Sequence, residues 1–107
     1  MTTKTAIQQM THRIAKRFNP DKIVLFGSYA RGSAGIDSDV DLLVIMPVSG
    51  SKRQMQVDIR CAVHDIPVSK DIIVATPQEI SSQQKVIGTL IRPAMKEGKI
   101  IYARRER

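Results

Sequence analysis

The chain has 107 residues, 42% of them hydrophobic, and a formal net charge of +7. This length predicts one domain, residues 1–107, and the sequence shows neither the run of roughly 20 apolar residues that a membrane span needs nor a secretory signal. A single cysteine excludes an intrachain disulfide and is typical of a reducing cytosol, so we expect a cytoplasmic protein without a membrane segment.

The positive charge by itself does not identify a partner. The basic residues are dispersed, only 4% of the residues are aromatic, and there is no tryptophan. The stacking platforms of single-strand binders are therefore missing, and nucleic acid is not expected as a direct ligand. A charged surface without a ligand, a phosphate-bearing ligand and an acidic protein partner remain open.

The first half of the chain predicts one long helix and two strands. Residues 3–18 form an amphipathic helix, because apolar residues recur there at helical spacing, and Pro20 ends it. Residues 22–26 predict a short buried strand, residues 29–32 a single helical turn, and residues 39–46 a second strand that Pro47 closes.

A second amphipathic helix is predicted from Ser51 to about Asp65, followed by a strand over residues 70–75. Cys61 takes an apolar-looking position in this helix, so we expect a buried and inert thiol. Asp58 and Asp65 lie in the same segment, where a solvated surface is the default for a carboxylate.

The last part of the chain carries the clearest local signal. Thr76-Pro77-Gln78-Glu79 combines a capping box with a proline at the first helical position. The helix that starts there continues, with a break near Gly88, to Glu97, where Gly98 stops it before a strand over residues 100–102. The whole order predicts an α/β (α+β) fold, a small mixed β-sheet packed with helices.

Two aspartates one residue apart, Asp39 and Asp41, open the apolar run of the second strand. Alternate residues of a strand point to the same face, so these carboxylates should project side by side. At close range they repel by about 1 kcal/mol in water and about 4 kcal/mol at an effective dielectric constant near 20. Protonation of one carboxylate or binding of a hard divalent cation relieves this repulsion. The alternative is a purely structural role, in which Asp39 and Asp41 cap a loop.

Gly27 and Ser28 end the preceding strand, so they meet the two carboxylates if the strands pair. A glycine lets a phosphate approach the backbone, and the serine adds a hydroxyl donor. Asp71 opens the third strand much as Asp41 opens the second, and three carboxylates at one edge of a sheet can hold two magnesium ions.

The motif Gly-Ser-x10-Asp-x-Asp resembles that of the polymerase-β-like nucleotidyltransferase superfamily, and Gly-Ser-Tyr-Ala-Arg-Gly followed by Ser-Asp-Val-Asp-Leu-Leu-Val resembles its minimal branch, the MNT proteins. The resemblance extends over essentially the whole chain and implies a nucleotidyltransferase-like fold. It places the phosphate-binding pair on Gly27 and Ser28, the metal ligands on Asp39 and Asp41, and the third carboxylate on Asp71. The Asp71 match depends on strand context and not on a fixed spacing.

The family implies transfer of a nucleoside monophosphate, usually AMP from ATP, with release of pyrophosphate, and its pattern implies two magnesium ions. Many minimal members resemble antitoxins that silence a HEPN-domain toxin, a ribonuclease, by AMP transfer or by direct binding. We therefore expect a magnesium-dependent enzyme that modifies a partner protein. The alternative is a binding antitoxin that acts by occlusion, and a nucleic-acid-binding module is the third hypothesis.

Three further expectations concern residues outside this motif. His12 and His64 should be surface histidines, because neither has a metal-ligand partner at helical spacing. Arg31 is equally suited to a phosphate contact and to a structural salt bridge. Both faces of the second strand are apolar beyond the aspartates, so we expect the face around Leu43 and Ile73 to be left exposed and then buried by a second chain, either another copy or the acceptor protein.

Overall fold

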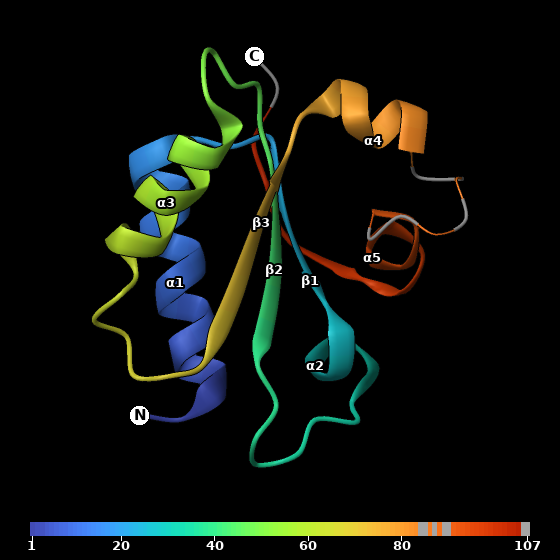
Figure 1. Cartoon of the computed structure of the whole chain (residues 1–107). Helices are drawn as coiled ribbons and strands as arrows, with labels where there is room; N and C mark the ends of the chain where they lie inside the picture. The colour runs from blue at the N-terminus through green and yellow to red at the C-terminus, as the bar shows by residue number, and fades with distance from the viewer. Residues whose placement is uncertain (84–85, 87, 89–90, 106–107) are drawn as a thin grey trace.

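The computed structural model describes residues 1–83, 86, 88 and 91–105 (Figure 1). Its helices are α1 (Thr3–Phe18), α2 (Gly27–Arg31), α3 (Lys52–Ala62), α4 (Pro77–Gln83) and α5 (Ile91–Glu97). Its strands are β1 (Lys22–Phe26), β2 (Val40–Ile45), β3 (Lys70–Ala75) and β4 (Lys99–Ala103). The predicted order of elements is confirmed, and the sequence also located the interruption between α4 and α5.

The four strands form one mixed sheet in the order β3-β2-β1-β4. β1 pairs antiparallel with both β2 and β4, whereas β2 pairs parallel with β3. The parallel pair needs a crossover, which α3 supplies. Because β2 and β3 run in the same direction, both begin at the same end of the sheet, where the α2–β2 loop also lies (Figure 1).

Helices cover both faces of this sheet. α1 and α3 lie on one side and α4 and α5 on the other, while α2 follows β1 at one end of the sheet and packs Ala30 into the core under α1 and α3 (Figure 1). Alternate residues of β2 divide accordingly, with Leu42 and Val44 in the core under α1 and α3, and Leu43 and Ile45 in the core under α5. The central strands β1 and β2 are apolar on both faces because neither face is left to solvent, whereas the edge strand β4 is exposed or half-buried throughout.

The expectation of an exposed face around Leu43 and Ile73 was wrong. Leu43 is only 1% exposed, and Ile73 is half-buried against the same core. The residues that cover this face are Ile91 and Ala94 of α5. Gly98 lets α5 approach closely, since a Cβ at this position would lie 2.2 Å from the carbonyl oxygen of Ala94 and 2.5 Å from Val24.

The expectation of a buried Cys61 was also wrong, because this thiol is exposed. Ile59 and Val63 are the fully buried residues in this part of the chain, and Cys61 lies two positions from each of them. Two positions on a helix correspond to a rotation of about 200°, which turns the side chain to the opposite side.

The helix that carries Cys61 ends at Ala62, three residues before the predicted end. Arg13 of α1 donates a hydrogen bond of 2.9 Å to the carbonyl oxygen of Ala62 and forms an ion pair with Asp65. A side chain from another helix thus satisfies a terminal carbonyl group of α3, which local sequence cannot reveal.

No helix in the described part of the chain combines the length and the hydrophobicity that crossing a membrane requires.

Candidate active site

The turn between β1 and α2 is built around Gly27. Its φ is 71°, in the left-handed region that glycine tolerates. A Cβ at Gly27 would lie 2.2 Å from Oδ2 of Asp41, so only the absence of a side chain lets this carboxylate rest against the turn. Ser28 follows in the first turn of α2, half-buried, and its carbonyl oxygen accepts a hydrogen bond of 3.0 Å from the backbone N–H of Ser33. The structure therefore brings the glycine of the predicted phosphate-binding pair into contact with one predicted metal ligand.

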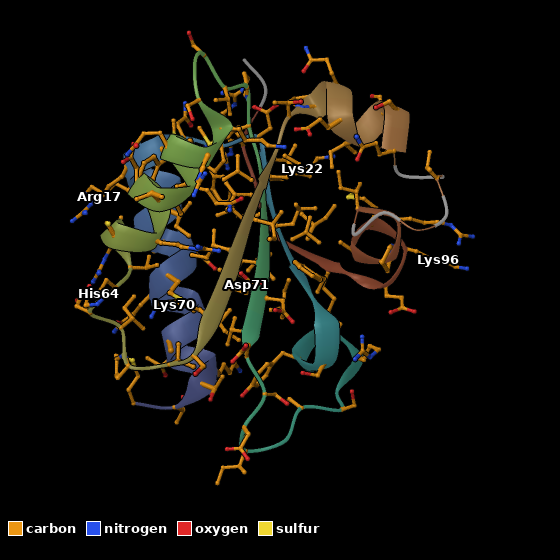
Figure 2. The ribbon with its side chains drawn as sticks, viewed as in Figure 1. Arg17, Lys22, His64, Lys70, Asp71 and Lys96 are labelled. Atoms are coloured by element: carbon orange, nitrogen blue, oxygen red, sulfur yellow. The ribbon has the colours of Figure 1, made fainter. Side chains whose placement is uncertain are left out.

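Asp41 and Asp71 are direct partners in the parallel ladder between β2 and β3. Their side chains project from the same face of the sheet, because paired residues of neighbouring strands share a pleat. Asp41 is half-buried and Asp71 keeps 48% of its side-chain surface exposed, whereas Asp39 lies in the exposed loop just before β2. Figure 2 shows Asp71 on β3.

The three carboxylates influence one another electrostatically. The pKa of Asp41 is raised above its ordinary value, first by burial and then by the negative charges of Asp71 and Asp39. The positive charge of Arg31 opposes this rise. Both burial and like charges disfavour the ionised form, so Asp41 stands at the centre of a concentration of negative charge that a cation would relieve.

Asp71 has a positively charged neighbour that the sequence did not reveal. Nη2 of Arg60, on α3, lies 3.2 Å from Oδ1 of Asp71. The two residues are eleven positions apart and belong to different elements, so no local pattern indicates the pair. Arg31, for which two roles were open, lies 3.7 Å from Glu97 in an exposed ion pair.

The carboxylates of Asp39, Asp41 and Asp71 are suitable magnesium ligands by chemical type, since this hard cation prefers oxygen ligands. Asp41 and Asp71 face each other across one ladder position, and burial, followed by the negative charges of Asp71 and Asp39, raises the pKa of Asp41. Within the described residues, no three carboxylate, imidazole or thiolate groups converge closely enough to hold an ion together. One oxygen of Asp71, Oδ1, is engaged by Arg60 in this arrangement.

The other titratable residues considered from the sequence have ordinary surroundings. His12 and His64 are exposed, as expected. Asp58 accepts a hydrogen bond of 2.9 Å from Gln54, and the hydrogen bond from Arg13 holds the pKa of Asp65 below its usual range. None of these four residues is among the electrostatic neighbours of Asp41 or the ion-pair partner of Asp71 described above.

A family model described as the nucleotidyltransferase domain matches residues 7–101, and the chain belongs to this family. A Sulfolobus solfataricus protein proposed to be a nucleotidyltransferase has a similar structure, with a TM-score of 0.60 and 24% identity over 94% of this chain and 79% of that chain. A chain of a toxin–antitoxin complex crystallised with AMP-PNP gives a TM-score of 0.58 and 18% identity over 95% of this chain and 74% of that chain. No curated protein matches the chain.

At these identities the two solved structures establish the fold, a nucleotidyltransferase-like arrangement of a mixed sheet and helices. Family membership follows from the domain match, which covers most of the chain. The branch of the family and the roles of individual residues stay predictions.

Proposed function

We propose that this chain is a magnesium-dependent nucleotidyltransferase that transfers AMP from ATP to a partner protein, and that it serves as the antitoxin of a HEPN-domain toxin. The observation that carries the catalytic part is the position of Asp41, which is in register with Asp71 and in contact with Gly27. This arrangement gathers negative charge beside the glycine turn that begins α2.

In the proposed reaction, an oxygen of an acceptor hydroxyl attacks the α-phosphorus of ATP, the bond to the bridging oxygen breaks, and pyrophosphate leaves. Gly27 and Ser28 bind the phosphates through the backbone and the serine hydroxyl. Asp39 and Asp41 would hold magnesium, and Asp71 would either contribute to a second ion or accept the proton of the attacking hydroxyl. Magnesium, when bound, offsets the charge of the triphosphate and lowers the pKa of the hydroxyl.

Two features support a protein as the acceptor. One structural relative belongs to a toxin–antitoxin complex with AMP-PNP, an analogue of ATP. The sequence resemblance to minimal nucleotidyltransferases favours a HEPN-domain toxin as the partner in such a pair.

The direct test combines the purified chain, labelled ATP, magnesium and a HEPN-domain protein encoded beside its gene. We expect label on the HEPN protein and loss of its ribonuclease activity. Asp71→Asn should lower turnover more than it lowers ATP affinity, because the proposed role of Asp71 concerns the attacking hydroxyl. If ATP affinity collapses while turnover persists, this role is wrong.

Silencing by occlusion is the second candidate, and the Arg60–Asp71 ion pair is the observation in its favour, since it engages one of the three carboxylates. Under this alternative the chain forms a stable complex that carries no label. The Asp41→Asn variant separates the two functions. It should fail to silence the toxin if transfer is required and should silence it normally if occlusion is sufficient.

A further inference from the structure

A groove of about 680 Å3 lies between α1 and the edge strand β4. Ile7 of α1 and Ile101 and Tyr102 of β4 give it an apolar floor, and Tyr29 of α2 closes one part of its wall. Lys4 and His12 of α1 are exposed at its rim. Since Tyr29 follows Ser28 in the sequence, the groove reaches the element that carries the candidate phosphate site.

The floor of the groove results from an irregularity in the sheet. Along β1, Ile23 pairs with Tyr102 and the next residue, Val24, pairs with Ile100, so Ile101 is an extra residue on β4. Such a bulge interrupts the alternation of side chains. Ile101 and Tyr102 are consecutive, yet both pack against the core under α1 and α3. Two neighbouring apolar side chains therefore face the groove where a regular strand would supply one.

The charge around the groove has one sign. The sequence of α1 contains two lysines, two arginines and one histidine but no aspartate or glutamate. A second hollow adjoins the groove through Gln8 and His12 and adds Lys16 and Arg17 to the same surface. Arg13 is paired with Asp65, whereas Lys4, Lys16 and Arg17 form no ion pair within the described part of the chain. Figure 2 shows Arg17 at the outer side of the layer formed by α1 and α3.

We propose that this groove binds an amphipathic helix of the partner protein, with apolar residues on the face that enters the groove and acidic residues beside them. An apolar floor of this kind accepts side chains spaced at helical intervals. The basic rim is complementary to carboxylates and speeds their encounter with the chain. This inference rests on the proposed function for the existence of a partner protein, and it deepens that function by assigning the surface and chemistry of contact.

The same features disfavour two other occupants. A second copy of the chain would bring the basic rims together, and like charges at an interface oppose association. A nucleic acid would find half-buried tyrosines packed into the core in place of exposed stacking faces.

The test uses the full-length chain labelled with nitrogen-15, observed by NMR. The probe is a synthetic helical peptide of about 18 residues with leucines at positions i, i+3, i+4 and i+7 and glutamates elsewhere. We expect amide shifts at residues of α1 and β4 that line the groove, and no comparable shifts from a peptide with lysines in place of the glutamates. The absence of shifts in the groove at about 1 mM peptide, or equal effects of both peptides, would overturn the proposal.

A matched pair of variants tests the charge of the rim. Lys4→Glu/Gln8→Glu alters the groove, whereas Arg53→Glu/Gln78→Glu alters exposed positions of α3 and α4, and each pair lowers the formal net charge by three. We expect the groove variant to weaken binding of the acidic peptide about tenfold and the control to leave it nearly unchanged in buffer of physiological ionic strength. Equal loss in both variants would show a general charge effect and refute the proposal.

Two further outcomes address the other occupants. Binding of a single-stranded oligouridylate to the same residues more tightly than the acidic peptide would indicate RNA and overturn the proposal. A dimer in solution, detected by light scattering, with the groove protected would overturn it in favour of self-association. The peptide experiment needs no ATP, so loss of AMP transfer with intact peptide binding counts against the proposed enzyme and not against the groove.

Discussion

The pKa of a carboxylate is shifted in opposite directions at the two ends of the parallel pair β2–β3. At the starting end, Asp41 and Asp71 are in register, and the pKa of Asp41 is raised by burial and by its acidic neighbours. Just beyond the finishing end, Glu79 lies in a capping box, and hydrogen bonds from Lys52 and then from the backbone of Thr76 lower its pKa. Hydrogen-bond donors stabilise the ionised carboxylate at the finishing end, whereas burial and two acidic neighbours disfavour the ionised form of Asp41 at the starting end, even with Arg31 nearby and with Arg60 paired to Asp71.

The largest expected effect is at the starting end. Asp41→Asn and Asp39→Asn should each lower AMP transfer by more than about 100-fold, because each removes a proposed magnesium ligand. Thermal stability without metal should hold or rise, since each change also removes a repulsive charge. Transfer of labelled AMP and thermal unfolding measure the two effects.

Asp37→Asn is the control for this prediction, since Asp37 is an exposed residue of the same loop with no assigned role. Transfer by the control should stay close to that of the unaltered chain. Substantial transfer by Asp39→Asn or Asp41→Asn would show that the metal ligands have been assigned wrongly.

Gly27→Ala should destabilise the fold by about 1–3 kcal/mol, because it combines a strained φ with the clash of a Cβ against Oδ2 of Asp41. Gly32→Ala is a matched comparison, with φ of 75° and no atom within 4 Å of its Cβ. Gly32→Ala should lower the free energy of unfolding by less, because it introduces backbone strain without a clash. Urea unfolding measures both variants. Equal losses would mean that the Gly27–Asp41 contact is unimportant.

At the finishing end, Thr76→Ala should cost about 1 kcal/mol of unfolding free energy without impairing transfer chemistry. The hydroxyl of Thr76 accepts a hydrogen bond of 3.2 Å from the backbone N–H of Glu79, and Glu79 accepts one of 2.9 Å from the backbone N–H of Thr76. Ser81→Ala, on the exposed side of α4, should change stability little. If both variants unfold at the same urea concentration, the capping box contributes nothing measurable.

The smallest effect is a pH dependence at the same end. Because the pKa of Glu79 is lowered in the folded chain, its ion pair with Lys52, 2.7 Å long, stabilises the fold above the ordinary glutamate pKa of about 4.3. This contribution should disappear as the pH falls through the lower folded pKa. The stability difference between the unaltered chain and Glu79→Gln should therefore be below about 1 kcal/mol near pH 6 and vanish in acid. A difference that grows as the pH falls would contradict this account.

Much of the fold follows from local patterns. The predicted strands at residues 22–26 and 70–75 coincide with β1 and β3, and the capping box at Thr76 forms both of its hydrogen bonds. The alignment of Asp71 with Asp41 could be anticipated because each opens an apolar strand, and the ladder confirms it. These features depend on residues close together in the sequence or on the simple alternation of a strand.

The features that the sequence did not reveal depend on contacts between distant elements. The burial of Leu43 depends on where α5 packs, and the apolar pattern of β2 does not say which segment covers it. Arg60 reaches Asp71 from another element, and Arg13 ends α3 from α1. The bulge at Ile101 is a register shift between β1 and β4, which the pattern of apolar residues in either strand leaves unspecified.

The exposure of Cys61 has a practical consequence. It is the one thiol of the chain, and it follows Arg60, the residue paired with Asp71. A fluorophore or nitroxide can therefore be attached at a single defined position without engineering a cysteine or removing another. Such a label stands next to the arginine that pairs with Asp71, so its signal offers a way to detect a rearrangement of this ion pair in real time as magnesium and ATP are added.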